Sequence, residues 1–271
     1  MPGSLWSKFR YTSPLECIID TNIRVFDITA ANISILTDSG NLEPDVYGRL
    51  CHVDKMDREI LIGKLIGDHP EIGEVLRNGI LEAKKIFFAM NSIEDDEVLE
   101  IDNDSVTIIG TRPIDHLKIF NHTFFREDAV FSSYYRIKST KYLYYCNRVN
   151  RFESLKVKGI SNQALAFHAL YMIDFLKELF FTAQFDGIQK ALYLLSSFYN
   201  SYISKGLPIE YYRTLDSRSV FELQNFDRYG RFSMLNVPMP NQRRLIDISY
   251  NEKILRELSR MLSSQYFIKM K

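Results

Sequence analysis

The sequence predicts an α+β fold, in which a mixed N-terminal part is followed by a helical C-terminal part. Up to about residue 160, short apolar runs of β type alternate with helical segments. From residue 162 onward, apolar residues recur at helical spacing. With 271 residues, 46% of them hydrophobic, the chain can bury a core as one large or two small domains. We place the boundary near Gly159, which predicts domains 1–160 and 161–271.

The N-terminal part begins with "IRVFDI" (23–28), an apolar, β-branched run that predicts a buried strand. The next segment, "AANISILTDSG", predicts a short helix or turn ended by Gly40. Helical periodicity then covers 44–66. The clearest helix is 71–93, where apolar residues recur every three or four positions.

An acidic hairpin is expected next. The β-type runs "EVLEI" and "SVTIIG" are separated by Asp102, Asn103 and Asp104, which are turn residues. Further strands are predicted at 129–138, 141–146 and 154–160. The remaining helices are predicted at 164–181, 188–203 and 251–267.

Several classes of protein are disfavoured by composition. No apolar run approaches the roughly 20 residues of a membrane span, and the N-terminus has no signal-peptide core. Three widely spaced cysteines without a CxxC pair predict reduced thiols in an intracellular protein. The five histidines form no metal-ligand spacing.

The charge distribution is uneven although the net charge is zero. Seven acids and no base lie between Glu94 and Asp104, and seven bases with one acid lie between 129 and 160. This order suits a protein that grips a polyanion beside a metal site. The alternative is two oppositely charged faces that pair or are only solvated.

Asp27, Asp102 and Asp104 are the candidate metal ligands. An Asp at the end of a buried strand is costly unless it is hydrogen-bonded or metal-bound. If strand 23–28 neighbours the hairpin, three carboxylates converge and can hold two Mg²⁺ ions about 3.5–4 Å apart. The alternative is a helix N-cap for Asp27 and ordinary turn chemistry for the other two.

The same segments resemble motifs of family B DNA polymerases. "FDITAANISILTDSGNLEPDVY" is similar to motif A, usually written DxxSLYPSI, and "LEIDNDSVTIIG" is similar to the D-T-D-S hairpin of motif C. Helix 71–93 stands where that family has its palm helix, and "LKVKGIS" resembles its KxxG-type strand. The resemblance covers roughly residues 20–165 and implies a palm, a much reduced fingers region at about 40–70 and a helical thumb.

The resemblance also implies roles for single residues. Asp27 and Asp104 would be the main metal ligands and Asp102 a helper. The backbone from Ile28 to Ala31 would lie along the incoming triphosphate, with Asn32 at the position of the family's sugar-excluding Tyr. Lys64 or Arg58 would bind the triphosphate. The residues expected to contact the primer or template strand are Lys156, Lys158, Arg136 and Tyr135.

Tyr134 and Tyr135 belong to a Tyr-rich run between 134 and 145, for which two roles are considered. In β-type runs such residues pack on or cover a sheet, whereas one or two of them could stack on bases. The KxxNSxYG pattern of motif B is not recognisable. We expect a protein without the exonuclease domain that precedes motif A in that family.

The function implied is a template-directed nucleotidyl transferase with two Mg²⁺ ions, acting on primer-template nucleic acid and nucleoside triphosphates. The departures from the family suggest a reduced enzyme of a virus or mobile element, to which another subunit supplies fingers or exonuclease. We expect it to act in the host cytoplasm and not at a membrane. The alternatives are a non-catalytic nucleic-acid-binding or scaffold protein with a degenerate palm, and a two-metal nuclease.

Overall fold

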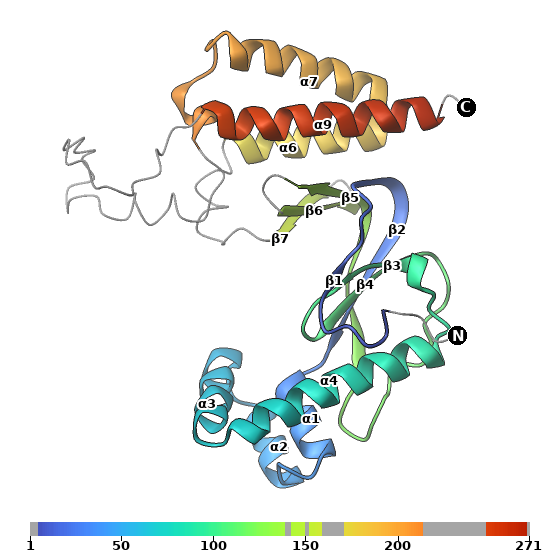
Figure 1. The fold of residues 1–271 in the computed structure, drawn as a ribbon, viewed down its shortest axis with the longest axis vertical. Coiled ribbons are helices and arrows are strands. Elements are labelled where there is room, and N and C mark those ends of the chain that lie inside the picture. The colour runs from blue at the N-terminus through green and yellow to red at the C-terminus, as the bar shows by residue number, and fades with distance from the viewer. Residues whose placement is uncertain (1–4, 139–141, 150–151, 159–170, 214–247, 270–271) are drawn as a thin grey trace, which may run out of the picture. The chain divides into compact units, whose positions relative to one another are not determined.

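The computed structural model describes residues 5–138, 142–149, 152–158, 171–213 and 248–269, and the fold is α+β with a helical C-terminal part, as predicted (Figure 1). Contacts within the chain define two compact units. The first unit comprises Met1–Pro14 and Thr21–Val130, and the second comprises Leu15–Asp20 and Phe131–Lys271. Each unit is described separately below.

In the first unit, four antiparallel strands follow the order β1-β3-β4-β2. The strands are β1 (Tyr11–Thr12), β2 (Cys17–Ile28, which starts in the second unit), β3 (Val98–Ile101) and β4 (Ser105–Ile109). Strand β2 pairs with β4 along five successive positions, from Ile23 opposite Ile109 to Asp27 opposite Ser105. The predicted neighbourhood of strand 23–28 and the hairpin is therefore confirmed.

The helices of this unit are α1 (Ala31–Asp38), α2 (Pro44–Cys51), α3 (Lys55–Asp68) and α4 (Pro70–Met90), with a 3-10 turn, η1, at Asp95–Glu97. The periodic stretch 44–66 thus forms two helices, because Asp54 caps a new one by accepting a hydrogen bond from the backbone N of Met56 at 2.8 Å. Helix α4 buries one face against the core. On that face Phe87 packs against Phe26 of β2 and Phe125 of β5, with ring centroids 5.4 and 4.1 Å apart.

The second unit joins an antiparallel ladder, β5-β6-β7, to a helical layer. The elements are β5 (Phe125–Ile137, which starts in the first unit), β6 (Tyr142–Val149), β7 (Phe152–Lys158), α6 (Met172–Phe181), a π-helical turn η2 (Thr182–Asp186), α7 (Ile188–Ile203), η3 (Ile209–Tyr212) and α9 (Ile248–Lys269). Helices α6, α7 and α9 lie alongside one another (Figure 1). Phe175 of α6 stacks on Phe198 of α7 with ring centroids 3.5 Å apart.

The predicted domain boundary near Gly159 falls outside the described residues and stays a prediction. The compact units meet at Val130, and β5 to β7 pack on the C-terminal helices, since the ring of Tyr135 in β5 stacks on that of Phe180 in α6 with centroids 3.9 Å apart. The same packing leaves Tyr135 with no exposed surface, so its ring is a core residue and not a nucleic-acid contact. The first part of predicted helix 164–181 lies outside the described residues.

Candidate active site

Asp27 and Asp104 form a pair of neighbouring carboxylates where β2 ends. Asp27 is opposite Ser105 in the antiparallel ladder, so Asp104 immediately precedes its partner. The backbone N of Ile28 donates a hydrogen bond to the carbonyl of Asp104 at 2.9 Å, which fixes the turn against the strand end. Two Asp residues that are 77 positions apart in the sequence are thus placed side by side by strand pairing.

Burial and neighbouring negative charge raise the pKa of Asp27 to about 6. Burial is the largest cause, followed by the charges of Asp104 and Asp128, while Arg126 and Lys55 act in the opposite direction. The side chain of Asp27 keeps 29% of its surface exposed, and its Oδ2 lies 3.9 Å from Nη2 of Arg126. A half-buried carboxylate whose charge is poorly balanced suits binding of a divalent cation.

Asp102 does not join the pair. Its Oδ1 accepts a hydrogen bond from the backbone N of Asn103 at 2.9 Å and lies 3.6 Å from Nε of Arg10. Across the part of the chain that the structure describes, no three His, Cys, Asp or Glu side chains gather closely enough to hold a metal ion. The predicted convergence of three carboxylates is therefore corrected to a pair, because Asp102 makes its contacts within its own turn and with Arg10.

Two carboxylates still fit a divalent cation as a partial ligand set. Mg²⁺ commonly uses one or two protein carboxylates and completes its shell with water and substrate phosphates. Asp27 and Asp104 would hold it. The pKa of Asp27 is raised by burial first and then by the neighbouring charges of Asp104 and Asp128, which such an ion would help to balance.

The residues predicted to bind the triphosphate lie at the end of β2 and on helices α1 and α3. Ile28 is buried, so only its backbone could face a ligand, and Asn32 lies half-buried in the first turn of α1. Lys64 is exposed on α3, and Arg58, on the same helix, points Nη1 at the carbonyl of Leu50 at 3.5 Å.

Two cations near Asp27 were missed by sequence reasoning. Lys55, the first residue of α3, and Arg126, the second residue of β5, are the bases whose charges lower the pKa of Asp27. Arg126 directly follows a buried Phe at a strand start, but nothing in the sequence shows that this strand start lies beside Asp27.

Three predicted nucleic-acid contacts share one face of the β5-β6-β7 ladder. Arg136 is opposite Leu143, which is in turn opposite Lys158. Lys156 stands two positions from Lys158 and therefore points to the same side, whereas Tyr135 points to the face on which α6 packs. The ladder thus presents three bases on the face opposite α6.

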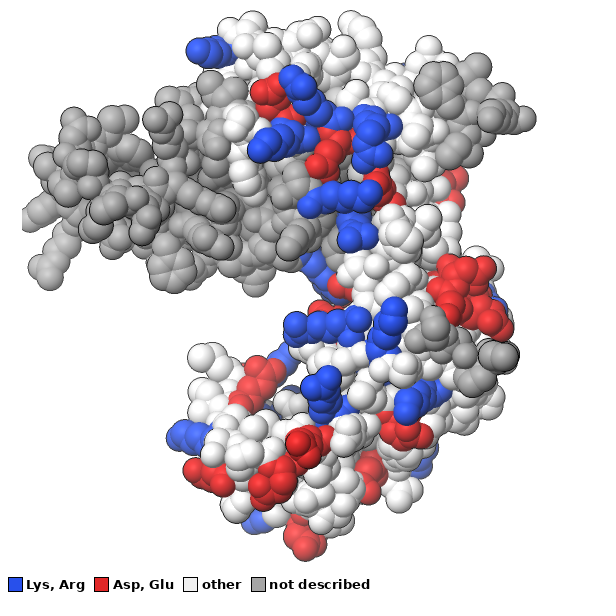
Figure 2. Space-filling model, viewed as in Figure 1, with Lys and Arg blue, Asp and Glu red and all other residues white. Residues whose placement is uncertain are grey.

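The acidic segment 94–104 makes its contacts within the first unit. Glu97 pairs with Arg112 at 2.7 Å, and Glu94 and Glu97 cap η1. In the basic segment, Lys138 forms an ion pair with Glu16. Figure 2 shows both signs of charge on the visible face, and the ion pairs of Glu97 and Lys138 balance part of the uneven charge within each unit.

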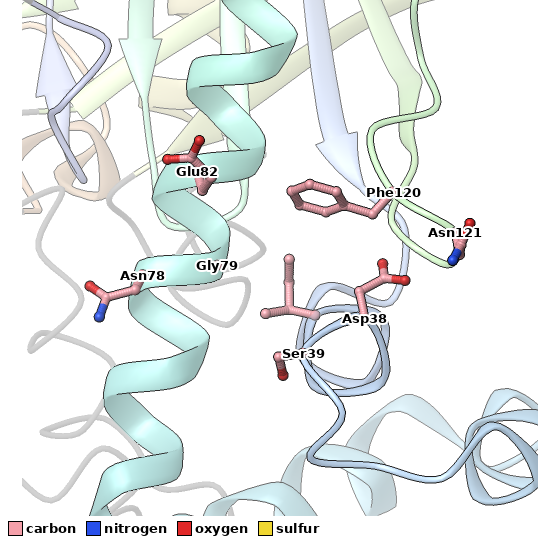
Figure 3. A pocket seen from close by; sticks show the side chains of 8 residues that line it. Asp38, Ser39, Asn78, Gly79, Glu82, Phe120 and Asn121 are labelled. Carbon is pink, nitrogen blue, oxygen red and sulfur yellow. The ribbon is translucent and has the colours of Figure 1, made fainter.

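A separate cavity of about 590 Å³ opens between α1, α4 and the loop before β5 (Figure 3). Its lining includes none of the predicted site residues. One lining residue, Asp38, accepts hydrogen bonds from the backbone N of His122 and from Oγ1 of Thr123, at 3.0 and 2.7 Å. Asp38 therefore fixes the loop to α1.

None of the described helices has the length and apolar character needed to cross a membrane. No curated protein matches the chain. A family model described as bacteriophage PBS1 gene 130 protein matches residues 1–255, which is most of the sequence. This match supports the predicted viral origin. We conclude that the chain belongs to the family of the bacteriophage PBS1 gene 130 protein.

Proposed function

We propose that the protein is a template-directed nucleotidyl transferase, in which a primer 3′-hydroxyl attacks the α-phosphate of a nucleoside triphosphate. The observation that supports this proposal most directly is the Asp27–Asp104 pair, formed by a strand end and a hairpin turn and electrostatically coupled. A divalent cation bound there would stabilise charge on the reacting phosphoryl oxygens and activate the hydroxyl.

The surroundings of the pair suit a triphosphate. Helix α1 begins four residues after Asp27, and the N–H groups of a helix N-terminus favour anions. Lys55 and Arg126 act electrostatically on Asp27 and could balance the charge of departing pyrophosphate. In this proposal Lys55 and Arg126 are added to Lys64 and Arg58, which stay predictions from the family resemblance.

The basic face of β5 to β7 supports the nucleic-acid part of the proposal. Arg136, Lys156 and Lys158 lie on one face of the ladder. Bases placed in this way on neighbouring strands can bind successive phosphates of a nucleic-acid backbone. The proposal also includes a further subunit that supplies fingers or exonuclease, and the host cytoplasm as the place of action.

The test is primer extension by the purified chain with Asp104→Asn and Asp27→Asn, in Mg²⁺ and in EDTA. We expect each substitution to lower incorporation by about 100-fold or more. Asp96→Asn is the matched control, since Asp96 is an exposed acid in the same segment. Full extension by Asp104→Asn would refute the mechanism. Shortening of a labelled strand would instead indicate a nuclease.

The ion pair between Arg126 and Asp27 favours a second candidate, a non-catalytic nucleic-acid-binding protein with a degenerate palm. An Arg beside the carboxylate offsets part of its negative charge and would compete with a metal ion there. This candidate predicts duplex binding that is insensitive to EDTA, no incorporation, and no loss of binding in Asp104→Asn.

A further inference from the structure

Lys84 of α4 is a buried lysine whose ammonium group contacts the turn that contains Asp102 and Asp104. Its side chain is completely buried. Nζ donates hydrogen bonds to the carbonyls of Asp102 and Asn103, at 3.2 and 3.1 Å, and to the carbonyl of Phe9 at 3.1 Å. The ammonium also lies 4.8 Å from the centroid of the Phe9 ring.

All three hydrogen atoms of the ammonium group are used by carbonyl oxygens, so its hydrogen-bonding capacity is filled without a carboxylate. Burial of a lysine is costly, and the pKa of Lys84 is lowered to about 8, mainly by burial. Charge-assisted hydrogen bonds of this kind are stronger than neutral ones and compensate part of that cost. Such an arrangement fixes the acceptor carbonyls rigidly.

Three consecutive carbonyls of the turn consequently have a defined donor. Those of Asp102 and Asn103 accept from Lys84, and that of Asp104 accepts from the backbone N of Ile28. The backbone of Asp104 is thereby held between helix α4 and the end of β2. The direction in which the Asp104 carboxylate leaves the backbone depends on these contacts.

We propose that Lys84 is a positioning residue, which acts through the turn carbonyls to set the Asp104 carboxylate beside Asp27. The proposal rests on the proposed function for its catalytic meaning, but the positioning itself can be measured without catalysis. Lys84 also donates to the carbonyl of Phe9 in the N-terminal segment, so the conformation of that segment is coupled to that of the turn.

The experiment uses the full chain with Lys84→Met and Lys84→Arg. The matched control is Asn91→Ala, since buried Asn91 ends the same helix and donates to the carbonyls of Phe87 and His116, away from the turn. Two quantities are measured: amide hydrogen exchange at Ile28 and Asp102, whose N–H groups bond the turn, and the affinity for Mn²⁺ without nucleotide.

We expect Lys84→Met to speed exchange at Ile28 and Asp102 about tenfold relative to other amides of the first unit, and to weaken Mn²⁺ binding by about 10-fold or more. Lys84→Arg keeps the charge and should give an intermediate effect. It still tests the proposal if Lys84→Met fails to fold. Asn91→Ala should lower thermal stability but change neither quantity.

Wild-type exchange rates at both amides in the folded Lys84 variants would overturn the proposal, as would an equal effect of Asn91→Ala. If the wild-type chain binds no Mn²⁺, the metal-dependent function fails, whereas the exchange rates still decide whether Lys84 positions the turn.

Discussion

The carboxylate of Asp104 lies close enough to that of Asp27 to be the largest charge acting on it, and together with burial it raises the pKa of Asp27 to about 6. A residue with this environment destabilises the fold when it is ionised. The proposed metal ligand is therefore also a residue that lowers the stability of the first unit, so the pair can be examined by stability measurements as well as by assays of activity.

The first prediction concerns pH. The pKa of Asp27 is higher in the folded chain than its ordinary value of 3.8, so the folded state binds this proton more tightly. The free energy of unfolding should fall as pH rises from about 4 through about 6, by about 1–2 kcal/mol after allowance for solvent screening. Urea unfolding in EDTA at several pH values measures this loss.

Asp27→Asn should remove that part of the pH dependence and be more stable than the wild type at pH 8. Asp96→Asn, which removes an exposed charge, serves as the control and should keep the wild-type profile. Identical profiles for wild type and Asp27→Asn would contradict the environment described for Asp27.

The second prediction concerns Arg126, whose Nη2 lies 3.9 Å from Asp27 and 3.5 Å from Oδ1 of Asp128. A divalent ion at Asp27 competes with this guanidinium. We expect Arg126→Gln to tighten Mn²⁺ binding two- to five-fold, about 0.4–1 kcal/mol. Titration calorimetry can measure it, with Lys118→Gln as a charge-matched control in the same unit. Weaker Mn²⁺ binding in Arg126→Gln would show that Arg126 supports the site.

The third prediction concerns Gly79 at the wall of the cavity in Figure 3. A Cβ at this position would lie 2.3 Å from Cγ2 of Ile35, so α1 and α4 approach too closely for any side chain. Gly79→Ala should lower the free energy of unfolding by about 1–3 kcal/mol.

Adding Ile35→Ala to Gly79→Ala should cost less than the sum of the two single changes, because the clashing methyl is gone. Gly63→Ala is the control: nothing lies within 4 Å of its Cβ position in α3, and it should stabilise by about 0.5–1 kcal/mol. Denaturant melts of the four variants measure all of these values, and a neutral Gly79→Ala would contradict the close approach.

The fourth prediction concerns the basic face of β5 to β7. If Lys156 contacts phosphates, Lys156→Gln should weaken duplex binding about equally for different sequences and reduce the salt slope by about one. Lys253 on α9 is exposed and outside the predicted face, so Lys253→Gln is the control. Fluorescence anisotropy at several salt concentrations gives both slopes. Equal slopes for the two variants would remove Lys156 from the interface.

Local signals in the sequence were sufficient for much of the fold. The apolar spacing of 188–203 matches α7 from end to end, and Asp102 to Asp104 mark the turn between β3 and β4. Those features depend on neighbours in the chain. The split of 44–66 into α2 and α3 was missed, although the N-cap Asp54 gave a local signal for it.

Long-range contacts were the part that periodicity could not predict. Arg126 and Lys55 reach Asp27 only through tertiary packing, and the unit boundary depends on which layer covers β5. For Lys84 a signal was present: it stands four residues from both Ile80 and Phe88, on the stripe that α4 buries. A lysine that interrupts an apolar stripe indicates a buried ammonium group with specific acceptors.

The division of the chain into units has a consequence for its synthesis. Residues 15–20 leave the ribosome early, yet they belong to the second unit, where Glu16 pairs with Lys138 and, at 2.5 Å, with Arg260 of α9. The second unit can therefore close only after α9 has emerged, whereas all residues of the first unit have been synthesised once Val130 is added. A chain truncated within α9 should fold its first unit but leave residues 15–20 without their α9 partner.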